Sequence, residues 1–135
     1  MPGTDITVSS NQAISTTLTI AANDATGASN ALQLQTQFGT VMAVGFQMPV
    51  LPVAANLVLE ISLDNGMTWL STALSALGSA WNTYPTSVQT AGTYQAIDPA
   101  SMLGATAIRF VSGSAATPVV QTSAVSINVM TRAVH

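Results

Sequence analysis

Two carboxylates that lie close together in the sequence, Glu60 and Asp64, are the first groups to consider for acid–base chemistry. They belong to a chain with five acids, two arginines, no lysine and no cysteine. Apolar alternation places both on one face of a predicted strand, about 13 Å apart at the usual rise per residue. Paired glycosidase carboxylates are closer, at about 5 to 9.5 Å. We therefore predict no catalytic acid pair and no enzymatic activity.

Metal and nucleophilic chemistry have equally little support. His135, the single histidine, is the last residue, and terminal residues are normally too poorly ordered to act as a base or ligand. The tip Asp64-Asn65-Gly66 could offer oxygen atoms to calcium, but calcium takes roughly six to eight ligands and no repeated acidic pattern surrounds this tip. Asn-Gly is the preferred pair of a two-residue type I′ hairpin turn. We predict a structural turn there, with no catalytic residue, metal or cofactor.

Four aromatic residues could form a platform on which sugars stack: Trp69, Trp81, Tyr84 and Tyr94. That arrangement would make the protein a carbohydrate- or receptor-binding module. In the other interpretation, Trp69 lies within an alternating strand and packs in the core or at a subunit contact, because aromatic side chains in small β-domains mostly contribute buried apolar area. Both interpretations stay open at this point.

The charge content is unusual and excludes several partners. Charged residues make up 5% of the 135 residues, whereas a typical soluble domain has about 25%. With so few cations the chain cannot neutralise a run of phosphates, so we expect no nucleic-acid binding. A surface of Ser, Thr, Asn and Gln resembles the neutral exterior of an assembled particle, and it lacks the charge that limits self-association.

The sequence also bears on disulfide bonding, secretion and membrane insertion. Without cysteine, no disulfide can form and the redox compartment stays undetermined. The first ten residues lack a basic segment followed by an apolar core, so we expect no secretory signal. We expect the protein to be made in a cytoplasm. The most apolar segment, residues 41–63, is interrupted by prolines and polar residues, and we expect no membrane insertion.

Frequent Val, Ile and Thr, short apolar alternations and regular Gly and Pro predict an all-β domain. About eight short strands favour an antiparallel β-sandwich of jelly-roll type in one domain. We expect residues 1–30 to form an N-terminal strand or arm with a flexible connection, as part of the same domain, and residues 31–135 to form the sandwich. The expected strands are residues 5–10, 14–20, a strand that begins at Leu32 and ends before Gly39, and residues 41–48, 55–64, 67–72, 93–97, 105–113 and 119–131.

The clearest predicted strand is residues 55–64. It turns Leu57, Leu59, Ile61 and Leu63 toward the core and leaves the opposite face wet or at an interface, with Glu60 opposite Arg109 on a neighbouring strand. Residues 71–90 are the least regular, with a short helical turn and then a loop. A second helical turn follows at residues 98–103, where Asp98 is the N-cap and Pro99 takes the first helical position.

A series of motifs runs from residue 57 to residue 131. It contains a S-x-D-x-G-x-T-W hairpin, an A-G-T-Y strand start, a D-P turn and the pattern I-R-F-x-S-G-x-x-A-x-P-V-x-Q. This series resembles small virion proteins of tailed bacteriophages, in particular jelly-roll capsid decoration (cement) proteins. One departure from the family pattern is the apolar insert STALSALGSA after Trp69. The matching positions are Ser62, Asp64, Gly66, Thr68 and Trp69; Ala91 to Tyr94; Asp98 and Pro99; and residues 108–121.

The resemblance implies a protein that binds the outer surface of the major capsid protein shell and ties neighbouring subunits together. It implies a homo-oligomer, a dimer or a trimer, located on the virion and made in a bacterial host. Many modest contacts, repeated over the shell, would stabilise the head without chemistry. The residues predicted to face the partner are Asp5, Ile6, Thr7, Val8, Glu60 and Arg109.

Overall fold

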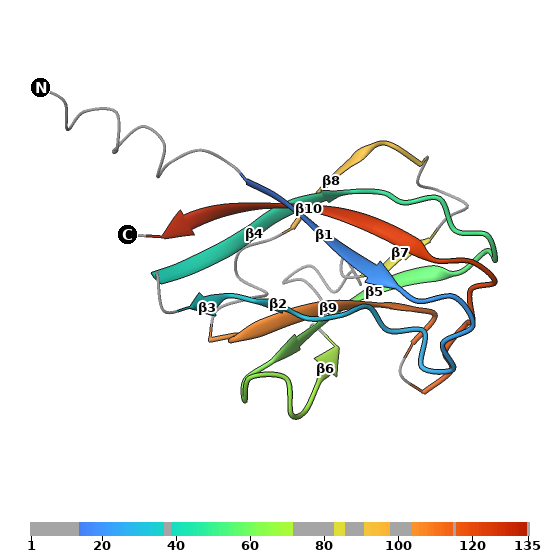
Figure 1. Cartoon of the computed structure of the whole chain (residues 1–135), viewed down its shortest axis with the longest axis horizontal. Helices are drawn as coiled ribbons and strands as arrows, with labels where there is room; N and C mark the ends of the chain where they lie inside the picture. Colours follow the sequence, from blue (N-terminus) through green and yellow to red (C-terminus); the bar gives the residue numbers. More distant parts are fainter. Residues whose placement is uncertain are drawn as a thin grey trace, which may run out of the picture.

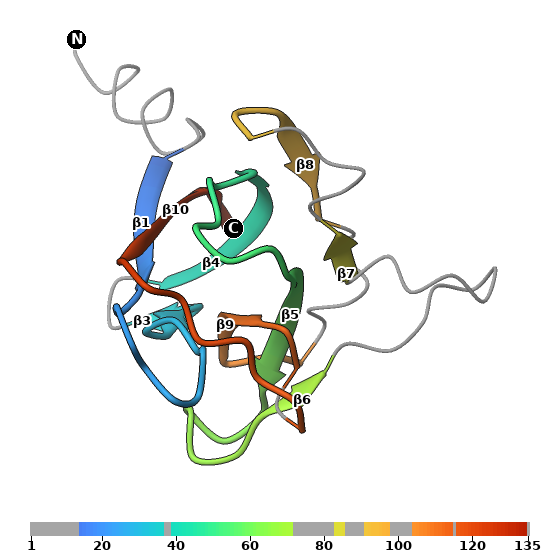
Figure 2. The same cartoon turned by 90° about the vertical axis from the view of Figure 1, so that its right-hand side faces the viewer.

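The computed structural model describes residues 14–36, 39–71, 83–85, 91–97, 104–114 and 116–134. These residues form ten strands and no helix. The strands make two antiparallel sheets that pack face to face (Figures 1 and 2). The predicted all-β sandwich is therefore confirmed. No helix that could cross a membrane occurs among the described residues.

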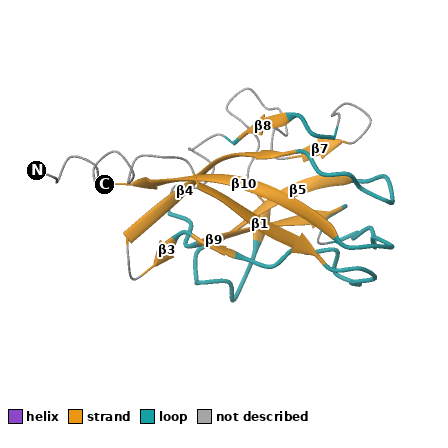
Figure 3. Cartoon of the chain, turned by 45° about the horizontal axis from the view of Figure 1, so that its top comes forward, coloured by secondary structure: helices purple, strands orange, loops and turns teal. Residues whose placement is uncertain are grey.

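Sheet A has five strands. Its order is β1 (Ile14–Ile20), β10 (Val125–Val134), β4 (Gly39–Gln47) and β3 (Gln35–Thr36), and β8 (Tyr94–Ala96) also pairs with β4. The strands β1, β10 and β4 lie side by side in Figure 3. The predicted strands at residues 14–20, 41–48 and 93–97 are confirmed in this sheet.

Sheet B also has five strands. Its order is β2 (Leu32–Gln33), β9 (Ala107–Ser112), β5 (Asn56–Ser62) and β6 (Leu70–Ser71), and β7 (Thr83–Pro85) also pairs with β5. The predicted strands around β5 and β9 are confirmed. Strand β7 lies in a segment that we predicted to be a loop, and its pairing with residues 56–58 of β5 corrects that prediction.

Two phenylalanines join the sheets at the centre of the core. Phe46 in β4 and Phe110 in β9 are fully buried, and their ring centroids lie 4.8 Å apart at an interplanar angle of 55°. Such tilted contacts are among the arrangements that aromatic pairs prefer. The other members of the buried cluster come from both sheets and the adjoining loops: Leu18, Ile20, Leu34, Ala43, Met48, Leu57, Leu59, Ile97, Ala105, Ile108, Val125, Ile127 and Val129.

The sequence predicted a single strand beginning at Leu32, but the structure has two short strands there. Its first two residues pair with β9 in sheet B, and residues 35–36 pair with β4 in sheet A. Between them lies the buried Leu34. Its amide donates a hydrogen bond to the Thr106 carbonyl, and its carbonyl accepts one from the Val41 amide. Leu34 therefore satisfies its backbone groups where the chain crosses from one sheet to the other.

The exposure of β5 differs from the prediction. Leu57 and Leu59 are buried as expected, but the opposite face is buried as well: Val58 is 7%, Glu60 1% and Ser62 0% exposed. A strand covered on both sides is a central structural element rather than one with a wet face. Leu63, predicted to face the core, is 55% exposed because the strand ends at Ser62.

The segment at the start of the described chain belongs to the sandwich. Strand β1 pairs with β10 over its whole length, from Ile14 opposite Thr131 to Ile20 opposite Val125. Leu18 and Ile20 enter the core, while Thr17 and Thr19 are exposed, as the alternation predicted. Residues 14–20 thus form a core strand, and the predicted strand at residues 5–10 and the helical turn at 98–103 lie outside the described residues.

Candidate interaction surfaces

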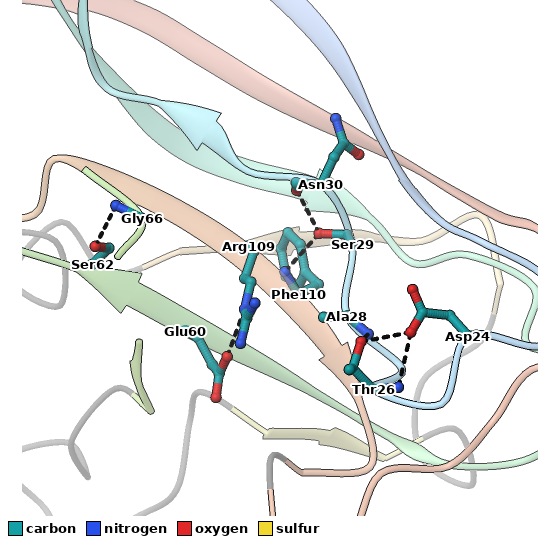
Figure 4. A network of polar contacts seen from close by, with 10 residues as sticks. All are labelled: Asp24, Thr26, Ala28, Ser29, Asn30, Glu60, Ser62, Gly66, Arg109 and Phe110. Atoms are coloured by element: carbon teal, nitrogen blue, oxygen red, sulfur yellow. Dashed lines mark hydrogen bonds and ion pairs between the residues drawn. The ribbon is translucent and has the colours of Figure 1, made fainter. Parts of the chain in front are cut away.

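The outer side of sheet B carries a buried ion pair. Glu60 lies directly opposite Arg109 on the neighbouring strand β9, which confirms the predicted pairing. The Arg109 Nε donates to Glu60 Oε1 at 2.8 Å, and the side chains are 24% and 2% exposed, respectively (Figure 4). Such charge-assisted hydrogen bonds are among the stronger ones, and a buried carboxylate needs a cationic partner to stay charged.

Trp69 completes this cluster. The Arg109 guanidinium carbon lies 4.5 Å from the centroid of the Trp69 ring, within cation–π range. Trp69 is partly buried, which agrees with the prediction of a packed aromatic more than with a free sugar platform. A contact with a partner through Glu60 stays a prediction, and the accessible part of this ion pair is on Arg109.

The loop between β5 and β6 is built around the carboxylate of Asp64. Asp64 Oδ1 accepts from the Ser62 hydroxyl and from the Thr68 amide, both at 2.8 Å, and Oδ2 accepts from the Thr68 hydroxyl at 2.6 Å. The hydroxyl of Thr68, its amide and the hydroxyl of Ser62 together lower the Asp64 pKa to about 2. The carboxylate oxygens are thus directed at the loop itself.

The backbone of this loop shows the conformation that Asn-Gly predicts. Asn65 has φ 60° and Gly66 has φ 93°, both in the region that type I′ turns require. The Gly66 amide donates to the Ser62 hydroxyl at 2.7 Å (Figure 4), and the Asn65 amide donates to the Thr106 hydroxyl at 2.8 Å. The turn is confirmed, but the connection spans residues 63–69, so the predicted two-residue hairpin is wrong.

The same loop presents three large apolar side chains outward. Met67 is 84% exposed, Leu63 55% and Leu70, the first residue of β6, 52%. We call these three residues the apolar tip. Because Asp64, Ser62 and Thr106 hold the backbone beneath them, the apolar tip sits on a fixed support at the end of sheet B.

A polar row crosses the outer face of sheet A. The Thr17 hydroxyl donates to Asn128 Oδ1 at 3.1 Å, and Asn128 Nδ2 donates to Gln47 Oε1 at 3.2 Å. Gln47 Nε2 in turn donates to the carbonyl of Gly92 at 3.3 Å. Thr17 pairs with Asn128 in register, so β1, β10 and β4 each contribute one side chain to this polar row, and the carbonyl of Gly92 ends it.

The polar row was not found from the sequence. The alternation of residues 14–20 and 125–130 places Thr17 and Asn128 on the sides away from the core, but the order β1-β10-β4 and its register were not predictable from one chain. The available signal was the alternation itself, which places Thr, Asn and Gln on the outward sides of three strands.

Two further polar groups hold loops together inside the fold. Gln121, fully buried, accepts from the Val53 amide and donates to the Val53 carbonyl, both at 2.9 Å, and it also donates to the Ser112 hydroxyl at 2.8 Å. Ser29 accepts from the Phe110 amide at 3.0 Å and donates to the Asn30 carbonyl at 2.8 Å (Figure 4). Each of these groups is satisfied by partners within the chain.

Asp24 repeats the local chemistry of Asp64 in the loop after β1. Its Oδ1 accepts from the amide and hydroxyl of Thr26 at 2.8 and 2.6 Å, and the Thr26 hydroxyl accepts from the Ala28 amide at 3.3 Å (Figure 4). The two Thr26 bonds, the hydroxyl first, lower the Asp24 pKa. This acid therefore stabilises a turn.

Several predicted residues fall outside the described parts of the chain: Asp5, Ile6, Thr7, Val8, Trp81, Asp98, Pro99 and His135. The backbone of Tyr84 is described within β7, but its side chain is not. Among the described residues, no group of three or more His, Cys, Asp or Glu side chains is placed to hold a metal ion.

Comparison of the chain with known proteins identifies no relative. No protein-family model, no curated protein and no solved structure matches the chain.

Proposed function

We propose that this protein is a structural component of a bacteriophage virion, a decoration protein that binds the outer surface of the major capsid protein shell. The proposal includes the jelly-roll type of sandwich and a homo-oligomeric form, a dimer or a trimer. The motifs from residue 57 to residue 131 suggest this function, and the apolar tip is the structural observation that supports it best.

The apolar tip has the properties of a contact surface. Leu63, Met67 and Leu70 expose apolar side chains from a loop whose backbone is fixed by buried or partly buried polar groups. Soluble monomers rarely expose large contiguous apolar patches, and those that they do expose often bind a partner. A pre-formed loop also loses little conformational entropy on binding.

The low charge of the chain suits a permanent place in an assembly. Burying ions at an interface costs desolvation free energy, and the cores of protein interfaces are depleted in charged residues. Here the Glu60 carboxylate is already neutralised by Arg109 inside the chain. A capsid surface could cover this end of the sandwich without leaving the acid unpaired.

The edge of sheet A offers a second mode of contact. Asn30 exchanges hydrogen bonds with Thr19 of β1, Ser29 lies opposite Ile20, and residues 14–18 lie at the border of the described sheet. A strand from another chain could extend the sheet there through main-chain hydrogen bonds. The arm at residues 5–8 is the predicted counterpart on a neighbouring copy.

Co-sedimentation with capsids that lack the protein tests the proposal. The unchanged protein is expected to bind and to raise the temperature at which the capsids rupture. A triple variant, Leu63→Ser, Met67→Ser and Leu70→Ser, should lose most of the binding. The matched control is Val50→Ser with Val120→Ser, two exposed apolar residues elsewhere, which should bind as the unchanged protein does.

Failure of the unchanged protein to bind such capsids would refute the decoration function. If the triple variant, checked for folding by circular dichroism, binds as well as the control, the apolar tip is not the contact.

A further inference from the structure

The Tyr94 side chain lies over Gly45 on the outer face of sheet A. A Cβ atom added to Gly45 would overlap the Tyr94 hydroxyl and the adjoining ring carbons, so the ring covers this glycine. The Tyr94 hydroxyl donates to the Val44 carbonyl at 3.0 Å, which fixes the end of the ring. The side of the ring turned away from Gly45 faces outward, and the residue is 58% exposed.

The amide of Gln47 lies next to this ring, and the amide of Asn128 lies one strand further across the sheet. Gln47 is the direct cross-strand neighbour of Tyr94, and Asn128 bonds to Gln47. Each amide has two donor hydrogens and an acceptor oxygen with two lone pairs. The bonds along the polar row use one donor of each, so both keep further hydrogen-bonding capacity while their orientation is fixed.

A shallow depression continues the surface beyond Gln47. It has a volume of about 360 Å³, and its lining includes Gln47, Val50, Gly92 and Ser126. Along β4 and its continuation, the order is Gly45 beneath the ring, then Gln47, then the depression. At about 3.3 Å per residue, this path from residue 45 to residue 50 is roughly 17 Å long, longer than one pyranose ring.

We infer that this face of sheet A binds a neutral oligosaccharide, with one sugar stacked on Tyr94 and the next bonded to Gln47 and Asn128. An exposed aromatic ring suits the apolar face of a sugar, and adjacent amides suit its hydroxyl groups, which both donate and accept. Thr17, Asn128, Gln47, Tyr94 and Ser126 are all uncharged. That composition favours a neutral ligand over a phosphate, a nucleic acid or an anionic glycan.

This site is independent of the proposed capsid contact. The apolar tip belongs to the connection between β5 and β6 of sheet B, whereas Tyr94 and the polar row belong to sheet A. A decoration protein with such a face would present a glycan-binding surface to the outside of the particle, and binding on either face can fail without the other.

The first experiment is a screen of the full chain on an array of neutral oligosaccharides built from glucose, galactose, mannose and N-acetylglucosamine, with sialylated and sulfated counterparts. The expected result is binding to at least one neutral series at millimolar or tighter affinity. Titration of the ¹⁵N-labelled protein with that oligosaccharide should then shift the side-chain amide signals of Gln47 and Asn128 and the backbone signal of Tyr94.

Variants locate the site. Tyr94→Leu keeps an apolar cover on Gly45 but removes the aromatic face, and it should weaken binding by at least about tenfold. Asn128→Ala provides a second variant at a partly exposed position and should weaken binding as well. Met67→Ala, in the loop between β5 and β6, is the matched control and should bind the oligosaccharide as the unchanged protein does.

Absence of binding to every neutral oligosaccharide would overturn the inference. So would spectral shifts confined to sheet B, or folded Tyr94 and Asn128 variants with unchanged affinity. Preferential binding of the sialylated or sulfated series would also contradict it, because the polar row carries no cation.

Discussion

At the scale of single residues, four of the charged side chains that the structure describes make their contacts within the chain. Glu60 is paired with Arg109, and Asp64 and Asp24 each hold a turn. The sequence alone does not distinguish an acid that is paired for catalysis from an acid that is paired in a structural ion pair. The position of Arg109, one strand away and over the Trp69 ring, gives Glu60 its partner within the chain.

The Asp64 carboxylate makes the stability of the loop dependent on pH. Its pKa is about 2 in the folded protein and 3.8 in an unperturbed carboxyl, so the stabilisation is fully present above about pH 4 and is lost as the pH falls toward 2. Asp64→Asn lacks this titration. We expect the variant to be less stable near neutral pH, with a difference from the unchanged protein that shrinks as the pH falls from about 4 to about 2.

Urea unfolding followed by fluorescence at several pH values measures this difference. Asp24, whose pKa is also lowered, is present in both proteins, so comparing them isolates Asp64. A difference that stays constant between about pH 7 and about pH 2 would show that the carboxylate charge does not stabilise the loop.

At the scale of strands, the sequence predicted which segments form strands better than it predicted how those strands pair and connect. The alternation in β1 and β10 assigned buried and exposed sides correctly because a side-chain period of two is a property of the strand itself. In β9, Ile108 and Phe110 face the core as predicted, but Ala107 and Val111 on the other side are buried as well. The alternation in β5 could not show that both of its faces are buried, since burial depends on segments distant in sequence. The break at Leu34 was missed for the same reason, because the two sheets compete for one short segment.

The candidate surfaces follow the same division. The turn at Asn65-Gly66 was predictable because local backbone conformation decides it. The polar row depends on the register of β10 against β1 and β4, which includes an irregularity between Met130 and Thr131. Such a shift realigns side chains between strands and leaves no signature in the pattern of a single strand.

The contact between β4 and β8 gives a prediction at this scale. Gly45→Ala places a methyl group where the Tyr94 ring lies, so the ring must leave the sheet surface. In the background Tyr94→Ala, the same substitution meets no ring. We expect Gly45→Ala to cost about 1 kcal/mol more in the unchanged protein than in the Tyr94→Ala protein, as coupled neighbours do in double-mutant cycles.

Chemical denaturation of the four proteins measures this coupling. Equal costs of Gly45→Ala in the two backgrounds would mean that the ring does not rest on the glycine, and the flat platform proposed for sugars would lose its support. Gly45→Ala is also expected to weaken binding of a neutral oligosaccharide, whereas it should leave capsid binding unchanged.

At the scale of the whole molecule, the low charge decides how the protein can associate. With two arginines and five acids, long-range attraction contributes little, and contacts must come from apolar side chains and neutral hydrogen-bonding groups. Capsid binding through the apolar tip is therefore expected to change little between low and high salt, because screening acts on charge–charge attraction. Sedimentation binding curves over a range of sodium chloride concentrations provide the measurement.

A steep loss of capsid affinity with added salt would contradict this expectation and would indicate that Arg109 and Arg132 contact acidic groups on the partner. The two outcomes are separable by substitution. If the apolar tip governs binding, Met67→Ser reduces affinity at every salt concentration and Arg132→Gln changes it little. If charge governs binding, Arg132→Gln flattens the salt dependence and Met67→Ser leaves it intact, because each exposed cation that meets an anion adds its own screened contribution.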